Sequence, residues 1–425
     1  MASEYDIRFD GNSSGVFFAG QTLTGSVELN LTKVKKVAGI FVHFKGYCEV
    51  SWPKKSGTDN NRPTAHYTGR EEYLDITLYL AGAKNGPAFE LQPGHHSYPF
   101  SCPLPPTLAT SIEGQWGHVR YSVKLTLERP WKFDNTHTVS FTVLRHLDLN
   151  DNSQDICHPV KVEKNKIFCC FPCSSDPLFM AAEIPIAGYV PGQTVAIKYN
   201  VNNQSSRSVY GFTANLIRTD VFKCEQPRIK EKSTETVVAS VKYDGIGPRE
   251  ETTFEQLLKI PSCPPTTLVC NLMTVTYAIQ LEIGVTGLSF DPTLDFPITI
   301  GTIPLANTAV PGYQSATNVS PVATQPMPMM ITQPMPFAPP NPDVSSIGPT
   351  APLLPRQFSA DLPPPTFEEA MHVNPVNNGK KKEGEAPAVG WLDFNPKYMV
   401  YQFDGNSIEA ASNSPHPIEF PMPKV

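Results

Sequence analysis

The chain has 425 residues, which is too long for a single hydrophobic core and fits two domains and a further segment. Its formal charge of −6 at pH 7 offers no overall positive field, so we expect no nucleic-acid partner. The sequence shows no secretion signal and no apolar run long enough to span a bilayer, and its nine cysteines form no regular framework. We therefore expect a cytoplasmic protein with reduced thiols.

Residues 1–147 predict an antiparallel β-sandwich. Within them, residues 119–128 alternate between apolar side chains, such as Val119 and Tyr121, and polar ones. Alternation with a period of two places one face of a strand on a core and the other in water. Clusters of glycine, serine and asparagine, as at residues 11–15, separate the strands.

Residues 148–160 are polar and turn-prone, and we interpret them as a linker or hinge. The segment superficially resembles a calcium-binding loop. However, Ser153 stands where the glycine of the sharp turn belongs, and Pro159 stands where the bidentate glutamate belongs. We therefore expect no metal in this segment.

Residues 161–305 repeat the first domain. The triplet Gly20-Gln21-Thr22 returns as Gly192-Gln193-Thr194, and the strand 119–125 returns as the strand 275–281. A spacing of roughly 150–170 residues is that of a whole domain and is too long for a solenoid unit. The predicted fold class is therefore all-β, with two β-sandwiches in tandem.

Residues 306–425 are rich in proline and show little strand alternation. The pattern Thr324-Gln325-Pro326-Met327-Pro328 recurs at residues 332–336. Such a segment cannot bury enough apolar surface to offset its ordering entropy. We expect a disordered tail that carries short linear motifs.

Two motifs stand out in this tail. Pro364 and Pro365, followed by Phe367, form a proline ladder that ends in an aromatic ring, which is the pattern that WW domains hold between their aromatic side chains. The second motif consists of Asn395, Pro396 and Tyr398. It fits either a WW domain or a PTB-type pocket, and both stretches are also compatible with a plain disordered tail.

Lys33, Lys35 and Lys36 form a cluster of positive charge. One interpretation is a solvated strand edge, which lysines commonly guard against aggregation. The other is a contact with phosphorylated cargo or with acidic lipid headgroups, where several charges act together. The sequence leaves both interpretations open.

Cys169, Cys170 and Cys173 form the densest group of cysteines in the chain. Structural packing, acylation or redox modification, and metal binding are the three interpretations. A zinc site needs a second pair of ligands at suitable spacing, which the sequence does not show. A reactive thiol needs an environment that stabilises the thiolate.

No arrangement of residues in the sequence indicates catalysis. The chain has no phosphate-binding loop with Walker spacing and no His-Glu-x-x-His zinc helix. His95 and His96 would point to opposite faces of a strand, which makes them a poor pair for one metal ion. We expect neither an enzyme nor a cofactor.

Several short segments occur in a characteristic order over both sandwiches. They are Gly94–Phe100, Glu113–Tyr121, Arg129–Trp131, Leu147–Asn150, Cys169–Cys170, Gly188–Gln193 and Ile298–Leu305. Together they resemble the α-arrestins, which are also called arrestin domain-containing proteins. The resemblance covers roughly residues 5–305.

This resemblance implies two arrestin-like, immunoglobulin-type β-sandwiches joined by a hinge, and a tail that carries Pro-Pro-x-Tyr motifs. It also implies a non-catalytic adaptor that links membrane receptors or transporters to WW-domain HECT ubiquitin ligases and to endosomal sorting. Such an adaptor is cytoplasmic and is recruited peripherally to the plasma membrane and to endosomes.

Phe367 departs from that pattern, because it stands at the tyrosine of Pro-Pro-x-Tyr and lacks the hydroxyl. An unpaired partner of that hydroxyl would cost about 1–3 kcal/mol, or roughly 5- to 150-fold in affinity for the ligase. Two alternatives therefore stay open. One is an arrestin-fold scaffold without ligase coupling, and the other is a thiol-redox or thioredoxin-binding regulator, an activity for which one branch of the family is known.

Overall fold

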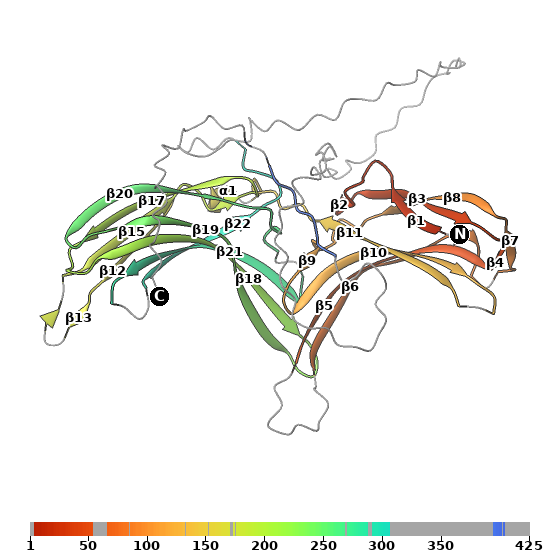
Figure 1. The fold of residues 1–425 in the computed structure, drawn as a ribbon, viewed down its shortest axis with the longest axis horizontal. Coiled ribbons are helices and arrows are strands. Elements are labelled where there is room, and N and C mark those ends of the chain that lie inside the picture. Colours follow the sequence, from red (N-terminus) through yellow and green to blue (C-terminus); the bar gives the residue numbers. More distant parts are fainter. Residues whose placement is uncertain are drawn as a thin grey trace, which may run out of the picture. The chain divides into compact units, whose positions relative to one another are not determined.

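The computed structural model confirms the predicted all-β fold of two tandem sandwiches (Figure 1). It describes residues 4–53, 66–84, 86–131, 133–151, 153–170, 173–174, 176–267, 270–287, 291–306, 394–401 and 403. In this described part, the only helix is the short α1 (Ser153–Ile156). No described helix combines the length and the apolar character needed to cross a bilayer.

The first sandwich packs a three-stranded sheet, β1-β3-β8, against a larger sheet with the order β2-β11-β10-β5-β6, in which β9 also pairs with β10. A small sheet of β4 and β7 lies at one end. The strands are β1 (Glu4–Phe9), β2 (Val16–Phe18), β3 (Thr22–Leu31), β4 (Lys35–Val37), β5 (Gly39–Pro53), β6 (His66–Gly82), β7 (Phe89–Leu91), β8 (Gly94–Pro103), β9 (Ile112–Glu113), β10 (Gly117–Glu128) and β11 (Asn135–Leu144).

The second sandwich repeats this arrangement with the sheets β12-β15-β17-β20 and β16-β22-β21-β18-β19, and with a hairpin of β13 and β14. In both copies a short strand pairs in parallel with the last long strand, β2 with β11 and β16 with β22. The strands are β12 (Val160–Lys166), β13 (Cys169–Cys170), β14 (Cys173–Ser174), β15 (Leu178–Ile184), β16 (Gly188–Tyr189), β17 (Thr194–Asn203), β18 (Val209–Cys224), β19 (Lys230–Ile246), β20 (Glu250–Lys259), β21 (Met273–Val285) and β22 (Thr293–Ile300).

The alternation read from the sequence corresponds to the buried faces of β10 and β21. Val119 and Tyr121 are fully buried in the first core, and Val275 and Ile279 are fully buried in the second. Burying a side chain of this size contributes about 1.5–3 kcal/mol relative to leaving it in water. The period-two pattern therefore supplies the hydrophobic driving force for both sandwiches.

The repeated Gly-Gln-Thr triplet forms the same turn in each copy. The side-chain oxygen of Gln21 accepts a hydrogen bond from the backbone N–H of Phe18 at 2.8 Å, and Gln193 accepts one from the N–H of Val190 at the same distance. Gly20 and Gly192 precede the glutamines with φ values of 89° and 98°. Glycine adopts this left-handed region without the steric cost of a Cβ, which explains why the triplet is repeated.

The two sandwiches contact each other through hydrogen bonds close to their ends. Leu147 donates its backbone N–H to the Thr302 hydroxyl at 2.7 Å, and Asn271 donates its side-chain amide to Glu71 at 2.8 Å. Within the stretch predicted as a linker, Asn150 donates to the carbonyl of Pro304 at 3.0 Å. The predicted boundaries of the domains, at residues 1–147, 148–160, 161–305 and 306–425, stay a prediction.

Candidate functional site at the junction of the sandwiches

Residues 394–401, drawn in blue in Figure 1, contact both sandwiches, although they belong to the stretch expected to be disordered. Lys397 lies against the first sandwich. Its backbone N–H donates to the Thr142 hydroxyl at 3.2 Å, and its ammonium donates to the Ser14 carbonyl at 3.0 Å. The expectation of a disordered tail therefore does not extend to this segment, which we call the docked segment.

Tyr398 is buried, like Pro396 of the same segment, with 6% of its surface exposed. Its ring packs against an apolar group of the first sandwich, formed by Val16, Phe18 and Leu144. Its hydroxyl donates to the carbonyl of Ser111 at 3.1 Å, so the buried phenol is satisfied. Burial raises the pKa of Tyr398 above its ordinary value, which keeps the phenol protonated at neutral pH.

Tyr401 and the backbone of the docked segment attach to the second sandwich. The Ser262 hydroxyl donates to the Tyr398 carbonyl at 3.3 Å, and the Tyr401 N–H donates to the carbonyl of Pro191 at 2.9 Å. The Tyr401 hydroxyl donates to the carbonyl of Thr302, and burial raises the pKa of this phenol to about 12. The segment therefore joins the two sandwiches, with the Tyr398 side chain on the first and Tyr401, together with the Tyr398 carbonyl, on the second.

Gly192 explains how the backbone of the docked segment comes so close to the second sandwich. A Cβ placed on this glycine would lie 2.0 Å from the carbonyl oxygen of Tyr401, well inside van der Waals contact. At the equivalent Gly20 of the first sandwich, a Cβ would meet only Pro106, at 3.6 Å. Both turns need glycine for their φ, but only Gly192 also leaves room for another part of the chain.

Charged side chains lie beside the docked segment at the junction. Arg218 contacts Asp220 at 2.6 Å and donates to the carbonyl of Glu113, in the first sandwich, at 3.0 Å. Glu113 in turn contacts Arg120 at 2.6 Å. Burial raises the pKa of both carboxyl groups, and the facing arginines counteract this effect. The positive charge of Arg218 also acts on the Tyr398 phenol.

A pair of buried thiols crosses the junction as well. The Cys48 side chain of β5 hydrogen-bonds Cys270, which precedes β21 in the second sandwich. The hydrogen bond from Cys48, followed by others from Tyr73 and the backbone, lowers the pKa of the Cys270 thiol to about 7. One of the backbone donors is the N–H of Met273, at 3.2 Å from the sulfur. Sequence reasoning singled out neither cysteine, because their proximity depends on tertiary contacts.

The tail motif and the cysteine cluster have different outcomes. Pro364, Pro365 and Phe367 lie outside the described residues. Cys169 pairs with Ser174, and Cys170 with Cys173, in the hairpin of β13 and β14. Among the described residues, no group of three or more His, Cys, Asp or Glu side chains is placed to hold a metal ion.

The second predicted tail motif, Asn395, Pro396 and Tyr398, is part of the docked segment. Because its tyrosine is buried between apolar side chains and the Ser111 carbonyl, a WW or PTB domain cannot reach that ring while the segment is docked. Recognition of this motif by such a domain stays a prediction that requires the segment to leave the junction.

The lysine cluster lies at the end of the first sandwich that carries β4. Lys33 and Lys36 are exposed, while the Lys35 ammonium contacts the Tyr5 hydroxyl and, at 3.4 Å, Asn135. The loop between β10 and β11 reaches the same place, because Arg129 also donates to Asn135, at 3.2 Å.

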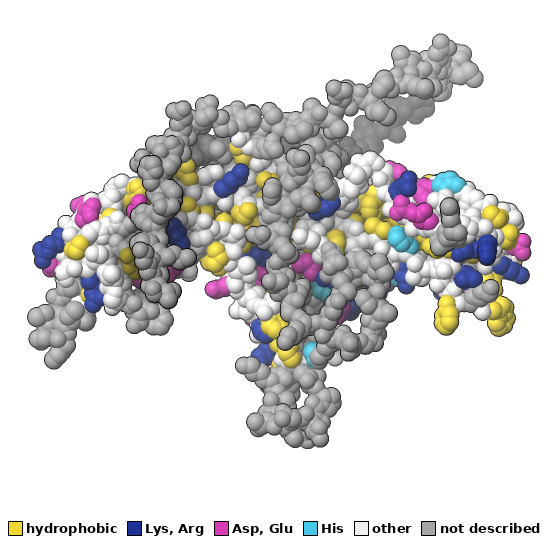
Figure 2. Space-filling model, viewed as in Figure 1, with side chains coloured by type: hydrophobic (Ala, Val, Ile, Leu, Met, Phe, Trp, Pro, Cys, Tyr) yellow, Lys and Arg dark blue, Asp and Glu magenta, His cyan; other side chains and the backbone are white. Residues whose placement is uncertain are grey.

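That loop exposes two aromatic side chains, Trp131 with a relative exposure of 102% and Phe133 with 97%. Val34, beside the lysines, is 50% exposed. In Figure 2, hydrophobic side chains project from this end of the sandwich beside lysine and arginine side chains. Full exposure of two large rings next to basic residues is typical of a contact surface rather than of a stable bare edge.

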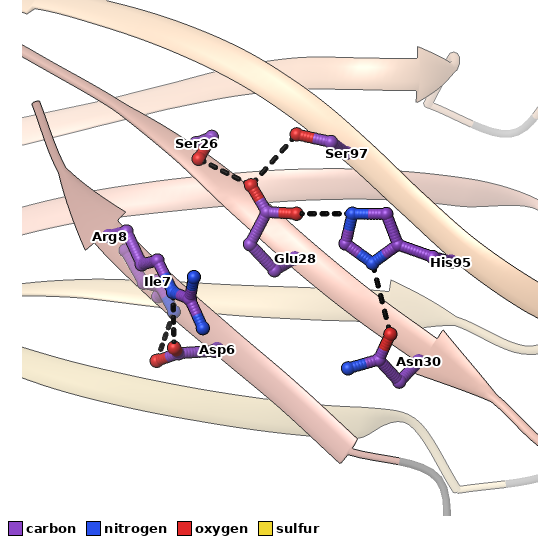
Figure 3. A network of polar contacts seen from close by, with 8 residues as sticks. All are labelled: Asp6, Ile7, Arg8, Ser26, Glu28, Asn30, His95 and Ser97. Carbon is purple, nitrogen blue, oxygen red and sulfur yellow. Dashed lines mark hydrogen bonds and ion pairs between the residues drawn. The ribbon is translucent and has the colours of Figure 1, made fainter.

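The outer face of the β1-β3-β8 sheet carries the polar network of Figure 3. Glu28 accepts hydrogen bonds from Ser26 at 2.6 Å and Ser97 at 2.8 Å, and it contacts His95 at 3.0 Å. The hydrogen bond from Ser26, then the one from Ser97, lowers the pKa of Glu28. His95 also contacts Asn30 at 3.0 Å. These partners satisfy one another, as in a surface network that stabilises a sheet.

The turn 11–15 has the spacing Gly-x-Ser-x-Gly, which in hydrolases marks a nucleophile. Here it connects strand β1 to strand β2, whereas the nucleophile elbow joins a strand to a helix. Asn12 organises the turn, because its side chain accepts from the Ser14 hydroxyl at 2.7 Å and donates to the Val16 carbonyl at 2.6 Å. The motif is therefore a structural turn.

Comparison with known proteins agrees with the duplicated fold. Residues 5–150 match the family model of the arrestin (or S-antigen) N-terminal domain, and residues 174–305 match that of the C-terminal domain. The chain belongs to the arrestin domain-containing proteins.

Two relatives illustrate the extent of the similarity. Arrestin domain-containing protein 17 of Caenorhabditis elegans is 32% identical over 315 residues, which is 71% of this chain and 70% of the relative. Arrestin domain-containing protein 4 of Mus musculus is 30% identical over 303 residues, or 70% of this chain and 71% of the relative. These matches indicate no enzyme family and support an arrestin-type adaptor.

Proposed function

We propose that this arrestin domain-containing protein is a non-catalytic trafficking adaptor. Its two sandwiches bind the cytosolic parts of membrane receptors or transporters, and its tail recruits a WW-domain HECT ubiquitin ligase. The consequences are ubiquitination of the cargo and its endosomal sorting. The protein acts from the cytoplasm and is recruited to the plasma membrane and to endosomes.

The observation that carries this proposal is the duplicated arrestin sandwich followed by a proline-rich tail. The sandwiches offer a large rigid surface from two packed cores, and the tail offers a proline ladder with a terminal ring. WW domains bind such ladders because polyproline II segments lose little entropy on binding. An adaptor needs both features in one chain, a rigid surface that binds cargo and a linear motif that recruits a ligase.

The ligase arm rests on Pro364, Pro365 and Phe367. Because Phe367 keeps the ring but lacks the hydroxyl, we propose that it binds a WW domain more weakly than tyrosine would. If the ligase arm is inactive, the protein is an arrestin-fold scaffold that sorts cargo without ubiquitination.

Titration of a peptide spanning residues 358–372 against a panel of WW domains tests the ligase arm. We expect weak binding that a Phe367→Tyr substitution strengthens by roughly 5- to 150-fold, and that Pro365→Ala abolishes. In cells, cargo ubiquitination should rise with the Phe367→Tyr protein and fall with Pro365→Ala. Absence of binding by both the native and the tyrosine peptide would refute the ligase arm and favour the scaffold.

The membrane arm rests on the loop with Trp131 and Phe133 and on the neighbouring lysines, Lys33, Lys35 and Lys36. Exposed tryptophan and phenylalanine partition into the interface of a bilayer, and lysines near the surface add about 1 kcal/mol each on anionic lipids. Glu90, Glu128 and Asp134 lie nearby and reduce this attraction. We propose that this edge contacts acidic lipid headgroups while cargo is bound.

A second candidate function, thiol-based regulation, is favoured by the contact of Cys48 with Cys270 across the junction. Hydrogen peroxide would oxidise the two thiols to a disulfide. The peroxide accepts the two electrons and the two thiol protons and is reduced to two molecules of water. The bond would covalently join the sandwiches. Cys48 is fully buried and Cys270 is only 2% exposed, so the reaction requires the junction to open.

Peptide mapping under non-reducing conditions, after treatment with hydrogen peroxide, tests this second candidate. A peptide pair linked through Cys48 and Cys270 is the expected product, and Cys48→Ser should eliminate it. The half-buried Cys157 serves as an internal control for general oxidation. Oxidation of Cys157 with no linked pair would exclude a disulfide at the junction.

A further inference from the structure

The surface that holds the docked segment presents hydrogen-bond acceptors at its key positions. The carbonyl oxygens of Ser111, Pro191 and Thr302 accept from the Tyr398 hydroxyl, the Tyr401 N–H and the Tyr401 hydroxyl, respectively. A carbonyl accepts and cannot donate, so a ligand must bring its own donors. Tyrosine fits where phenylalanine does not.

We propose that the junction of the two sandwiches is a binding site for a linear peptide with two tyrosines three residues apart, Tyr-x-x-Tyr, and that residues 394–401 are its ligand in cis. A second peptide of this chemistry, supplied in trans, takes the same site once the docked segment has left. The proposal does not depend on cargo capture or on ligase recruitment.

The spacing of the two tyrosines follows from the two-sided site. In a strand-like chain, residues three apart point to opposite sides of the backbone. Tyr398 accordingly places its ring on Val16, Phe18 and Leu144 of the first sandwich, while the Tyr401 hydroxyl reaches Thr302 of the second. A peptide with only the first tyrosine would lack the hydrogen bonds of Tyr401 to Pro191 and Thr302 in the second sandwich.

Gly192 adds a selective feature to the second half of the site. The carbonyl of Tyr401 lies where any side chain at position 192 would be, so the ligand backbone is admitted only by glycine. The equivalent Gly20 has no ligand backbone against it. Gly20→Ala and Gly192→Ala should therefore both strain their turns, but only Gly192→Ala should also block the site.

The contacts of the docked segment depend on its sequence and not on its covalent link to the sandwiches. The link does raise its local concentration, on the order of millimolar for a flexible chain. A peptide in trans therefore competes against a site that is mostly filled, and its apparent affinity falls by the fraction of molecules in which the site is empty. Removing the cis ligand should expose the site.

The test uses the full chain with Tyr398→Ala and Tyr401→Ala together, and a fluorescein-labelled peptide of residues 392–404. By fluorescence polarisation, we expect this variant to bind the peptide at least about tenfold more tightly than the native chain does. Adding Gly192→Ala should abolish binding, and adding Gly20→Ala should leave it. Tyr210→Ala, which removes an exposed tyrosine that contacts Asp291, should behave like the native chain.

Altered peptides test the chemistry of recognition. Replacing both tyrosines by phenylalanine should weaken binding by roughly 5- to 150-fold for each buried carbonyl left unpaired. A phosphate on the first tyrosine should abolish binding, since it adds bulk and about −1.5 to −2 charges opposite the Ser111 carbonyl, and the nearby Arg218 is already paired with Asp220. Equal affinity of the phenylalanine peptide would contradict recognition through the phenols.

A second measurement keeps the proposal testable if the double variant folds poorly. Native chain is mixed with excess isotopically heavy peptide, and amide hydrogen exchange of its own residues 394–401 is followed by mass spectrometry. Faster exchange in these residues, without change in β10 or β21, shows displacement. Unchanged exchange at saturating peptide, or equal binding by the native chain and the double variant, would overturn the proposal.

Discussion

Tyr121 and Tyr398 make the same kind of hydrogen bond in two very different settings. Tyr121 is buried in the first sandwich and donates to the carbonyl of Ala109 at 2.7 Å, and Tyr277 repeats this bond in the second sandwich, to Pro264 at 2.7 Å. Tyr398 donates to the nearby Ser111 carbonyl from the distant tail. The sandwich tyrosines are held by their own strands, whereas Tyr398 is held only by docking. Removing the side chain of Tyr121 or Tyr277 should therefore damage a core, whereas removing that of Tyr398 should release the docked segment.

The largest effect is expected for Tyr121→Ala. Removing a fully buried aromatic ring leaves a cavity and an unpaired carbonyl, so the free energy of unfolding should fall by about 3–5 kcal/mol. Urea unfolding followed by circular dichroism measures this. Tyr121→Phe should cost less, about 1–3 kcal/mol, because only the hydrogen bond is lost. An alanine cost below that of the phenylalanine variant would contradict this account of the core.

Tyr398→Ala should lower the free energy of unfolding by less than Tyr121→Ala does, and this loss should have an upper limit. If residues 394–401 leave the junction as a unit, as we propose, the loss cannot exceed their docking free energy, and we expect about 1–3 kcal/mol. A chain that ends at residue 393 should lose at least as much. The same urea experiment compares the two. A greater loss in Tyr398→Ala than in the shortened chain would show that Tyr398 supports the cores directly.

His118 should make the stability of the first sandwich sensitive to acid. The second sandwich lacks this histidine, because the equivalent position in β21 is Thr274. Burial, followed by the charges of Arg120 and Arg70, lowers the pKa of His118 to about 3, and its Nε2 has no hydrogen-bond partner among the described residues. The ordinary value is about 6.5. The unfolded chain therefore binds more protons below pH 6.5, and stability falls as the pH drops from 6.5 toward 3, by at most about 1.4 kcal/mol per pH unit.

Unfolding free energies at pH 7, 6 and 5 test this dependence. His118→Gln should be less sensitive to acid than the native chain, and the difference between the two proteins isolates the histidine from Glu113 and Asp220. These carboxyls have raised pKa values and act in the opposite direction. Identical pH profiles would place the His118 pKa near its ordinary value.

The smallest effect on stability is expected for Trp131→Ala and Phe133→Ala, within about 0.5 kcal/mol, because both rings are already in water. Their effect should appear in sedimentation with vesicles that contain phosphatidylserine, where binding should drop, while neutral vesicles bind neither protein. In the native chain, a blue shift of tryptophan fluorescence on anionic vesicles should accompany binding and vanish in Trp131→Ala. Equal sedimentation of both proteins would exclude this edge as the membrane contact.

Much of the fold was predictable from local pattern. Two features depend only on neighbouring residues. The period-two alternation in β10 and β21 corresponds to their buried faces, and the repeated Gly-Gln-Thr turn corresponds to a hydrogen bond between residues three apart. The docked segment was only partly predictable. Tyr398 stood out as a motif, yet its burial could not be inferred, because its partners lie more than a hundred residues away.

The sequence by itself determined that the chain folds as two β-sandwiches of one family, because hydrophobic alternation and turn chemistry act over a few residues. Tertiary structure alone decided which residues meet at the junction. Arg218 with Glu113 and Cys48 with Cys270 become neighbours only when two completed sandwiches pack together, and Tyr401 meets Thr302 only when the docked segment is in place. Their proximity depends on the geometry of surfaces, for which no short-range pattern in the chain is a guide.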